Sequence, residues 1–511
     1  MTSFAVNVDR MTLAADQTKT DSEEASQQPL FLHKPPYGDH LEARGWAFDA
    51  IGRSLSFIGN AVFVGTAVVH QAKINAGCLP EEVECTGVTK YGIRPSSFLA
   101  LYNVIVGLVS SALLPLLGAI VDHTPRRLFV ARISAVAYCI LLLPMIFISE
   151  KTWFVVAILL LLTALIGWVH SGMAFAYLPE MSDEKNTLER LNTSFTVVQF
   201  ATNVIYIVAV VGIAAAAGWV NDSLYTARLA QSINFVVTTL VWGYTWMKLM
   251  GPRPAISELT PESKLLTIGF RTIYRTSINI LTHHKALGWF YGSLAFSESA
   301  TQALLIIVTT YSIELLNFSS VQAGIMYLVV LVSSVVGCYL SQISLRLFSP
   351  IRSNQICLGS LVLSTALAAA FVKDSHALFY TFSSFWGICG GWKYTIERYI
   401  AITIIPKNQD AELMGAYLFF GQILAWLPPL VFTALNEAGI SIRINMLSLL
   451  VFWFISVSCL QAMGSYESAV SDANKDAEKP SSAICNAPNL AEELASKNMP
   501  EGQQMCRDEG L

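Results

Sequence analysis

Runs of apolar residues long enough to cross a lipid bilayer recur along the sequence and constrain the fold more than any other feature. The hydrocarbon core of a bilayer is about 30 Å thick, so a helix that crosses it needs roughly 20 such residues. By that measure the sequence predicts an all-α protein with about twelve membrane-spanning helices. They begin near the following residues: Ala50, Ser97, Leu128, Trp153, Thr193, Ala227, Leu287, Ser319, Asn354, Ala377, Glu412 and Ser441.

Composition and local motifs exclude several function classes. The chain is 54% hydrophobic and 13% charged, which is outside the usual balance of soluble proteins. Basic residues are scattered, so we expect no nucleic-acid partner. No GxxxxGK[ST] motif indicates an ATP-driven pump. The candidate ligands His123, His170, His283 and His284 form no metal-binding set with carboxylates. We therefore expect no enzymatic activity, no cofactor and no metal.

Polar segments divide the spans into two groups of six. Both ends of the chain are polar and poor in aromatic residues, which predicts disordered tails. Between the sixth and seventh spans, apolar residues alternate with Lys264, Arg271 and Arg275 at helical spacing, which predicts an amphipathic helix on the cytoplasmic face. The predicted parts are a tail, a six-helix half, a linker, a second six-helix half and a tail: 1–44, 45–250, 251–286, 287–465 and 466–511.

The distribution of Lys and Arg predicts the orientation. They gather in the loops after even-numbered spans, which places both termini in the cytoplasm. Asn221, in the sequon NDS, then faces the lumen or exterior and is a candidate glycosylation site. Cys78 and Cys85 lie close together in a polar loop on the same side. They could pair in an oxidising lumen or remain two free thiols.

The loop after the second span, GAIVDHTPRRLFV, carries a candidate gating motif. Gly118 would permit close helix approach, and Asp122 can accept hydrogen bonds at a helix end. Arg126 and Arg127 could bridge to a neighbouring helix as a charge latch that breaks when the halves move. The alternative is that both arginines are ordinary basic residues of a cytoplasmic loop.

The order of these residues resembles the cytoplasmic loop motif of the major facilitator superfamily, with Pro125 in place of the usual second glycine. The corresponding loop of the second half keeps Gly337 but has Ser341 where the acidic residue would stand. The latch is therefore expected on one side only.

Five charged residues lie inside predicted spans and are candidates for the transport path. Lys393 and Glu397 are one helical turn apart and could form an ion pair, while Arg398 points about 100° away and needs another partner. Alternatively, Lys393 and Arg398 reach the cytoplasmic surface. Glu298 lies among small residues in the seventh span, and Arg53 lies in the first.

Glu298 has two interpretations. A carboxylate inside a span can take up and release a proton, which makes it the best candidate for proton coupling. It could instead only neutralise Arg53 or Arg398. Three other polar residues are interpreted as structural or interfacial: Arg132, His170 and Arg443.

Several stretches resemble one branch of that superfamily, the autophagy-related vacuole effluxers and their bacterial relatives. These are GW at the start of the first span, GAIVDHTPRR, AFAYLPE, the acidic site of the seventh span and the segment from GGWKYTIERYI to LAWLPPLVF. The last segment shares these positions with the family: Gly390, Gly391, Arg398, Pro406, Glu412, Gly415, Tyr417 and Pro429. The chain departs from it at Glu298 and Ser299, where relatives usually have Asp-Gly, and at the charged Lys393 and Glu397.

The resemblance implies a major facilitator fold of two six-helix bundles in the vacuole membrane. It also implies export of amino acids, especially leucine-like ones, from the vacuole to the cytosol during autophagy. The residues alone indicate a carrier for a small polar solute, with protons as a candidate second partner and the lipid bilayer as its surroundings. Two other functions stay open: a carrier of a sugar or folate, and a nutrient sensor that does not transport. The plasma membrane is the alternative location.

Overall fold

The described part of the chain is helical, with no strand within it. The computed structural model describes residues 41–78, 85–181, 185–255, 265–373, 375–405 and 410–478. The first half contains these elements: α2 (Leu41–Ile58), η1 (Gly59–Val64), α3 (Gly65–Asn75), η2 (Pro95–Ser97), α4 (Phe98–His123), α5 (Arg127–Met145), α6 (Trp153–Tyr177), η3 (Leu178–Met181), α7 (Lys185–Ala216), α8 (Ser223–Tyr244) and η4 (Thr245–Leu249).

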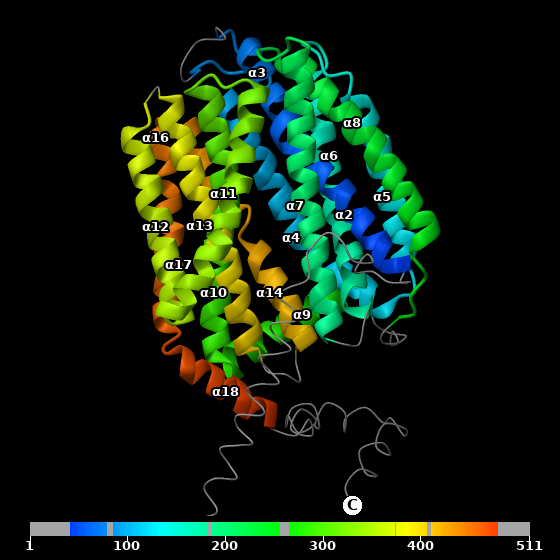
Figure 1. Cartoon of the computed structure of the whole chain (residues 1–511), viewed down its shortest axis with the longest axis vertical. Helices are drawn as coiled ribbons and strands as arrows, with labels where there is room; N and C mark the ends of the chain where they lie inside the picture. Colours follow the sequence, from blue (N-terminus) through cyan, green and yellow to red (C-terminus); the bar gives the residue numbers. More distant parts are fainter. Residues whose placement is uncertain are drawn as a thin grey trace, which may run out of the picture.

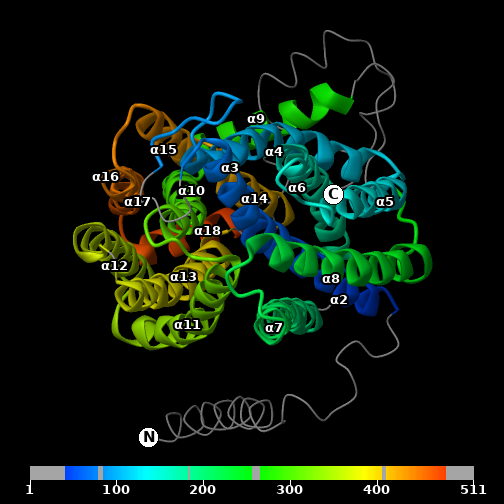
Figure 2. The same ribbon diagram turned by 90° about the horizontal axis from the view of Figure 1, so that it is seen from above.

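The linker and the second half are also helical. They contain these elements: α9 (Leu265–His283), α10 (Lys285–Glu314), α11 (Ser320–Leu347), α12 (Pro350–Phe371), α13 (His376–Ile404), α14 (Asp410–Ile423), α15 (Leu427–Glu437), α16 (Ile442–Met446), α17 (Ser448–Ala462) and α18 (Tyr466–Glu478). Helices of the two halves lie on opposite sides of the bundle (Figure 1, Figure 2). The predicted all-α membrane fold is confirmed.

Ten helical segments of the described chain are long and apolar enough to cross a membrane. The less apolar helices α8 and α13 run beside them in the bundle (Figure 2). The helices extend beyond the predicted spans: the first begins at Leu41 rather than near Ala50, and α7 begins at Lys185 rather than near Thr193. Apolarity marks only the part of a helix inside the bilayer, whereas its backbone hydrogen bonds continue into polar sequence.

The first span of each half is the most enclosed. In the most apolar window of Leu41–Asn75, 83% of residues are buried, and in that of Lys285–Glu314 the share is 67%. The other spans bury 22–39% of theirs. Because a lipid-facing helix leaves most of its side chains uncovered, these two spans form the centre of the bundle, where polar side chains are shielded from lipid.

Glycines bring α11 and α13 into close contact in the second half. A Cβ atom at Gly391 would lie 1.9 Å from the Ser334 carbonyl oxygen, and one at Gly337 would lie 2.0 Å from that of Ile388. Gly118 in the first half differs, because a Cβ atom there would meet nothing within 4 Å. The structure therefore shows no close helix approach at Gly118 itself.

The two ends of the bundle differ in their connections. The end that holds the Cys78–Cys85 disulfide is called the disulfide end below. At the opposite end lie α9 and α18, and α9 contacts α4 closely at Gly269 and Pro115 (Figure 1). The predicted tails were too long, because residues 41–44 begin α2 and residues 466–478 form α18. Apolar side chains of α18 such as Ala469 pack against the bundle, which explains the helix. The rest of both tails lies outside the described residues.

Candidate functional site

A cavity of about 520 Å³ lies between the two halves. Both central spans line it, α2 with Arg53 and α10 with Glu298. Its other polar side chains include amides and hydroxyls from several helices: Asn60, Asn103, Thr163, Gln199, Gln302, Thr309, Tyr394 and Gln422. The cavity thus combines one cation from the first half, one carboxylate from the second and uncharged hydrogen-bonding groups between them.

The carboxylate of Glu298 belongs to a cluster on α10 and α13. Lys393 Nζ lies 2.7 Å from Glu298 Oε2 and 2.8 Å from Glu397 Oε2. The other oxygen of Glu298 accepts hydrogen bonds from the Tyr394 hydroxyl at 3.0 Å and from Gln302 Nε2 at 3.1 Å. Ser297 donates to the other oxygen of Glu397 at 2.7 Å. All four carboxylate oxygens therefore have partners.

Burial within this cluster is uneven. The side chain of Lys393 is 0% exposed and that of Glu397 1%, whereas that of Glu298 is 13% exposed and faces the cavity. With both carboxylates ionised, the cluster holds two negative charges and one positive charge. A single proton on Glu298 would neutralise it, and the cavity gives solvent or solute access to that carboxylate alone. Such an arrangement can exchange a proton or a cationic group at one defined position.

A second cluster surrounds Asp49 on α2. This carboxylate is 0% exposed and accepts hydrogen bonds from Arg53 Nε at 2.7 Å, His170 Nε2 at 2.9 Å and Trp246 Nε1 at 2.9 Å. The indole of Trp242 donates to the backbone oxygen of Asp49 at 3.1 Å. Three donors from α2, α6 and η4 therefore stabilise one buried negative charge.

Arg53 presents its positive charge to the cavity. Its guanidinium lies 4.4 Å from the ring centre of Trp46 and 4.7 Å from that of Phe175, so aromatic faces support the cation. While Nε is held by Asp49, Nη2 is buried and has no hydrogen-bond partner among the described residues. A buried donor without a partner is costly. Arg53 as a whole borders the cavity, where its positive charge can attract an anionic group.

His170 makes polar contacts through both ring nitrogens. Its Nδ1 atom lies 3.1 Å from the Ser134 hydroxyl and 3.3 Å from the Ala131 carbonyl oxygen, while Nε2 contacts Asp49. A neutral ring can donate from Nε2 and accept from Ser134, and a protonated ring can donate from both nitrogens. His170 therefore links Asp49 on α2 with Ser134 on α5.

The structure changes the predicted pairing of charges. Glu298 pairs with Lys393 rather than with Arg53 or Arg398, and Arg53 pairs with Asp49. The expected Lys393–Glu397 pair is present, and Lys393 does not reach the surface. Arg398 is exposed, lies outside the cavity lining and forms no ion pair with a described residue.

Asp49, Tyr394 and Gln302 are site residues that the sequence did not reveal. Asp49 stands one residue before the predicted start of the first span, near Ala50, and was not singled out as a candidate. Its position four residues before Arg53 was an available signal for an ion pair. Tyr394 and Gln302 carry no charge, and nothing in their sequence context distinguishes them from packing residues.

The loop motif after α4 has a different geometry from the expected latch. Arg127 is buried and donates from Nε to the Val121 carbonyl oxygen at 2.8 Å, while Arg126 is exposed. Asp122 makes no ion pair with any described residue. The connection from α6 to α7, at residues 182–184, lies outside the described residues, and the latch stays a prediction.

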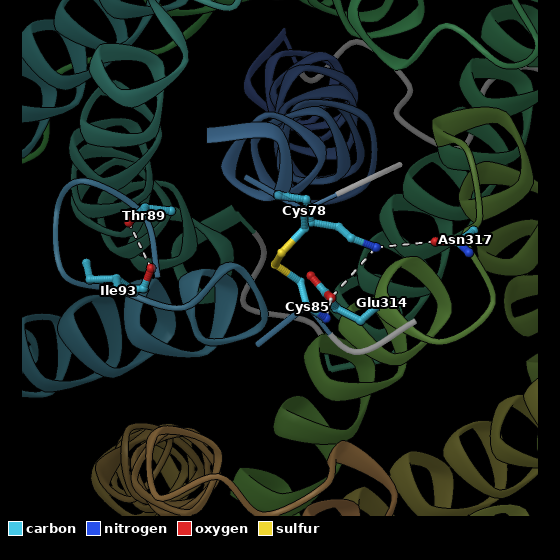
Figure 3. Close-up of a disulfide and its surroundings, with 7 residues drawn as sticks. Cys78, Cys85, Thr89, Ile93, Glu314 and Asn317 are labelled. Carbon is cyan, nitrogen blue, oxygen red and sulfur yellow. Dashed lines mark hydrogen bonds and ion pairs between the residues drawn. A yellow bond between two sulfur atoms is a disulfide. The ribbon is translucent and has the colours of Figure 1, made fainter. Parts of the chain in front are cut away.

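Polar contacts join the halves at the disulfide end (Figure 3). Lys73 Nζ on α3 lies 3.8 Å from Glu314 Oε2 on α10 and donates to Asn317 Oδ1 at 3.2 Å. The backbone amide of Cys85, in the loop joined to Cys78 by the disulfide, donates to Glu314 Oε2 at 3.4 Å. The Lys73 and Glu314 side chains are buried, so this end of the cavity is sealed.

Further contacts between the halves lie at the same end. His70 Nε2 contacts the Phe318 carbonyl oxygen at 2.9 Å, and Asn436 Nδ2 donates to the hydroxyls of Ser96 and Ser97 at 2.7 Å. The sequon residue Asn221 is exposed in the turn between α7 and α8, also at this end.

Comparison with solved structures reveals the same fold in several transporters. A mutant of the nucleoside transporter NupG matches with a TM-score of 0.56 and 13% identity, over 83% of this chain and 100% of that chain. The xylose transporter XylE from E. coli, in its inward-open conformation, matches with a TM-score of 0.54 and 13% identity, over 82% and 95%. A bacterial homologue of the human lysosomal transporter Spinster, inward-facing and unoccupied, matches with a TM-score of 0.55 and 13% identity, over 87% and 100%.

Sequence comparison identifies the family. No curated protein matches this sequence. The family model of the Major Facilitator Superfamily matches residues 50–429, which is most of the chain. The protein therefore belongs to the Major Facilitator Superfamily and is a multi-pass secondary transporter of small solutes.

Proposed function

We propose that the protein exports leucine-like amino acids from the vacuole to the cytosol during autophagy. The observation that carries this proposal is the pair of opposite charges in one cavity, Arg53 from the first half and Glu298 from the second. An amino acid zwitterion presents a carboxylate and an ammonium group, which match these two poles. The guanidinium of Arg53 supplies the positive pole for the carboxylate.

The remaining lining supports an aliphatic substrate. The side chains of Phe57, Leu305 and Ile306 face the cavity beside the polar groups and would cover an apolar side chain. The volume of about 520 Å³ lies within the range of about 300–1,000 Å³ that is usual for small-molecule sites. A leucine-like solute would use both properties.

Proton coupling through Glu298 completes the proposed cycle. The ammonium group of the substrate and a proton compete for the one carboxylate that reaches the cavity. The cluster with Lys393 and Glu397 holds excess negative charge, which either the proton or the ammonium group can balance. Exchange of a proton for the ammonium group at Glu298 would link amino acid movement to proton movement.

The sealed disulfide end supports an inward-facing state. If the Lys and Arg distribution gives the orientation, the disulfide end faces the lumen, both termini are cytoplasmic and the cavity is accessible from the cytosol. Opening the lumenal side then requires the Lys73–Glu314 pair to separate while the halves rock around the central site. Asn221 is in this orientation a glycosylation site on the lumenal surface.

A sugar carrier is the second candidate, because amide side chains are frequent in the lining. Asn60, Asn103, Gln199, Gln302 and Gln422 could hydrogen-bond a polyol. A neutral sugar would make no use of the positive charge that Arg53 brings to the cavity, so we favour the amino acid.

Substrate analogues test the two poles directly. Purified full-length protein in proteoliposomes should bind leucine, measured by competition against labelled leucine. Leucinamide lacks the carboxylate and 4-methylpentanoate lacks the ammonium group, so each should compete at least about tenfold more weakly. Binding of labelled xylose or labelled folate, without any binding of labelled leucine, would overturn the amino acid proposal. Leucine binding without flux would favour a sensor.

A further inference from the structure

A lipid-facing groove of about 350 Å³ lies between α5 and the α8–η4 segment, away from the central cavity. One wall is a stripe on α5 formed by Arg132, Val136, Ile140 and Leu143. The inner wall includes the indoles of Trp242 and Trp246. The term side groove is used below for this feature.

The dimensions of the side groove match one lipid chain. Arg132 and Leu143 are eleven residues apart on one helix, which at 1.5 Å per residue is about 16 Å. One leaflet contributes about 15 Å to the hydrocarbon core. Val136, Ile140 and Leu143 are 47%, 64% and 45% exposed, so the stripe is uncovered and apolar along its length.

A single cation stands at one end of this apolar stripe. Arg132 donates from Nε to the Trp246 carbonyl oxygen at 2.8 Å. No carboxylate in the described chain forms an ion pair with Arg132, and among the described residues its terminal guanidinium nitrogens have no hydrogen-bond partner. The planar fork of an arginine fits a phosphate, and a cation near lipid requires a counter-charge.

The inner wall connects the side groove with the central site. Trp246 donates its indole hydrogen to Asp49 Oδ1 at 2.9 Å, and Trp242 donates to the Asp49 backbone oxygen at 3.1 Å. Trp242 lines both the side groove and the central cavity. A molecule in the groove therefore contacts the side chains that position Asp49, and Asp49 holds Arg53.

We propose that the side groove binds one phospholipid, with an acyl chain along α5 and the phosphate on Arg132, and that this lipid stabilises the indoles that hold Asp49. The proposal does not depend on which solute the central cavity carries. The phosphate contact with Arg132 distinguishes this lipid from the surrounding lipids, which contact all outward-facing helices without a fixed cationic partner.

Arg228 provides a matched control at the other end of the same two helices. It lies on α8 and donates from Nε to the Ile148 carbonyl oxygen at 2.9 Å, in the same manner as Arg132. It does not line the side groove, and its guanidinium lies 5.2 Å from the ring centre of Tyr225. Loss of Arg228 removes an equal charge and an equal backbone contact without changing the proposed site.

Lipid retention by the full chain tests the proposal. Delipidated protein in detergent is titrated with phosphatidylglycerol, and bound lipid is counted by native mass spectrometry. We expect one tightly retained lipid per chain and about tenfold weaker retention in Arg132→Gln. Ile140→Trp, which fills the groove at an exposed position, should also lose it, whereas Arg228→Gln should not.

Two outcomes would overturn the proposal. Equal retention in wild type and Arg132→Gln would show that no phosphate rests on this arginine. Equal losses in Arg132→Gln and Arg228→Gln would show a general charge effect. Quenching of tryptophan emission by a chain-brominated phosphatidylglycerol checks the connection with the inner wall. After the emission of the added tryptophan is subtracted, quenching should be stronger in wild type than in Ile140→Trp. Equal quenching in the two proteins would show that the lipid does not contact Trp242 and Trp246.

Discussion

Each half of the bundle buries an ion pair between residues one helical turn apart. The order of the two charges along the helix differs between the halves, and so does the charge that faces the cavity. In the first half the carboxylate comes first, Asp49 before Arg53, and the cation faces the cavity. In the second half the cation comes first, Lys393 before Glu397, and the pair stays behind the cavity wall while Glu298 reaches it. The halves therefore present opposite charges to one solute.

The surroundings of the two pairs differ as well. Asp49 is enclosed by neutral or cationic donors, and with Arg53 it forms a pair of no net charge. Lys393 is shared by two carboxylates, so that cluster keeps one excess negative charge when both are ionised. The first half is thus suited to fixed recognition of an anion, and the second half to exchange of a proton or cation.

Removal of Lys393 should give the largest effect. Lys393→Met leaves the buried Glu397 and the cavity-facing Glu298 without their cation, which we expect to lower the free energy of unfolding by about 3–5 kcal/mol. Thermal unfolding in detergent measures the loss. The double variant Lys393→Met with Glu397→Gln should recover much of it, because only the cavity-facing carboxylate remains charged. A single variant as stable as wild type would contradict the shared ion cluster.

Loss of the cavity cation should come next. Arg53→Gln removes the donor proposed for the substrate carboxylate, which should weaken leucine binding by about 10- to 100-fold. Arg398→Gln is the control, since Arg398 is exposed and lies outside the cavity. Competition binding in proteoliposomes measures both. A similar loss in the two variants would show that net charge, rather than position, determines binding.

Asp49→Asn should have an intermediate effect on the same binding. It keeps the size of the side chain but removes the charge that holds Arg53 Nε and His170 Nε2. We expect leucine affinity to fall by about tenfold through loss of orientation of Arg53. Leucinamide, which lacks the carboxylate, should lose less affinity in this variant than leucine does. Equal losses would indicate general damage to the first half.

The matched serines should give the smallest effects. Ser297 donates to Glu397 at 2.7 Å in the second half, and Ser134 contacts His170 at 3.1 Å in the first. Ser297→Ala leaves a buried carboxylate oxygen unsatisfied and should lower the free energy of unfolding by about 1–3 kcal/mol. Ser134→Ala should cost about 1 kcal/mol or less, because the ring nitrogen keeps the Ala131 carbonyl as a partner when protonated. The reverse order in thermal unfolding would contradict the comparison.

The sequence predicted the fold well because apolar runs report burial in lipid directly. Most helix starts lie within a few residues of the predicted ones, and the helices run past the spans where their polar ends continue, as at Leu41 and Lys185. The Lys393–Glu397 pair was also accessible, since both residues are on one helix. Local spacing is sufficient for such features.

The arrangement of charges between helices was not accessible. Glu298 meets Lys393 only because α10 and α13 lie side by side, and no local pattern determines which of three candidate cations it meets. Asp49 was missed because its partners Trp246 and His170 lie on other helices, far from it in the sequence. Tertiary packing determines both the partner of Glu298 and the burial of Asp49. No periodic pattern in a single sequence shows how helices pack against one another.

The most direct test of the bipolar cavity is release of labelled leucine from preloaded proteoliposomes, with and without a pH gradient, in wild type and Glu298→Gln. The account predicts that the gradient changes the wild-type rate, and that Glu298→Gln retains a folded protein but loses the response to the gradient. A Glu298→Gln protein whose leucine release still follows the gradient as in wild type would contradict the assignment of Glu298 as the exchangeable charge.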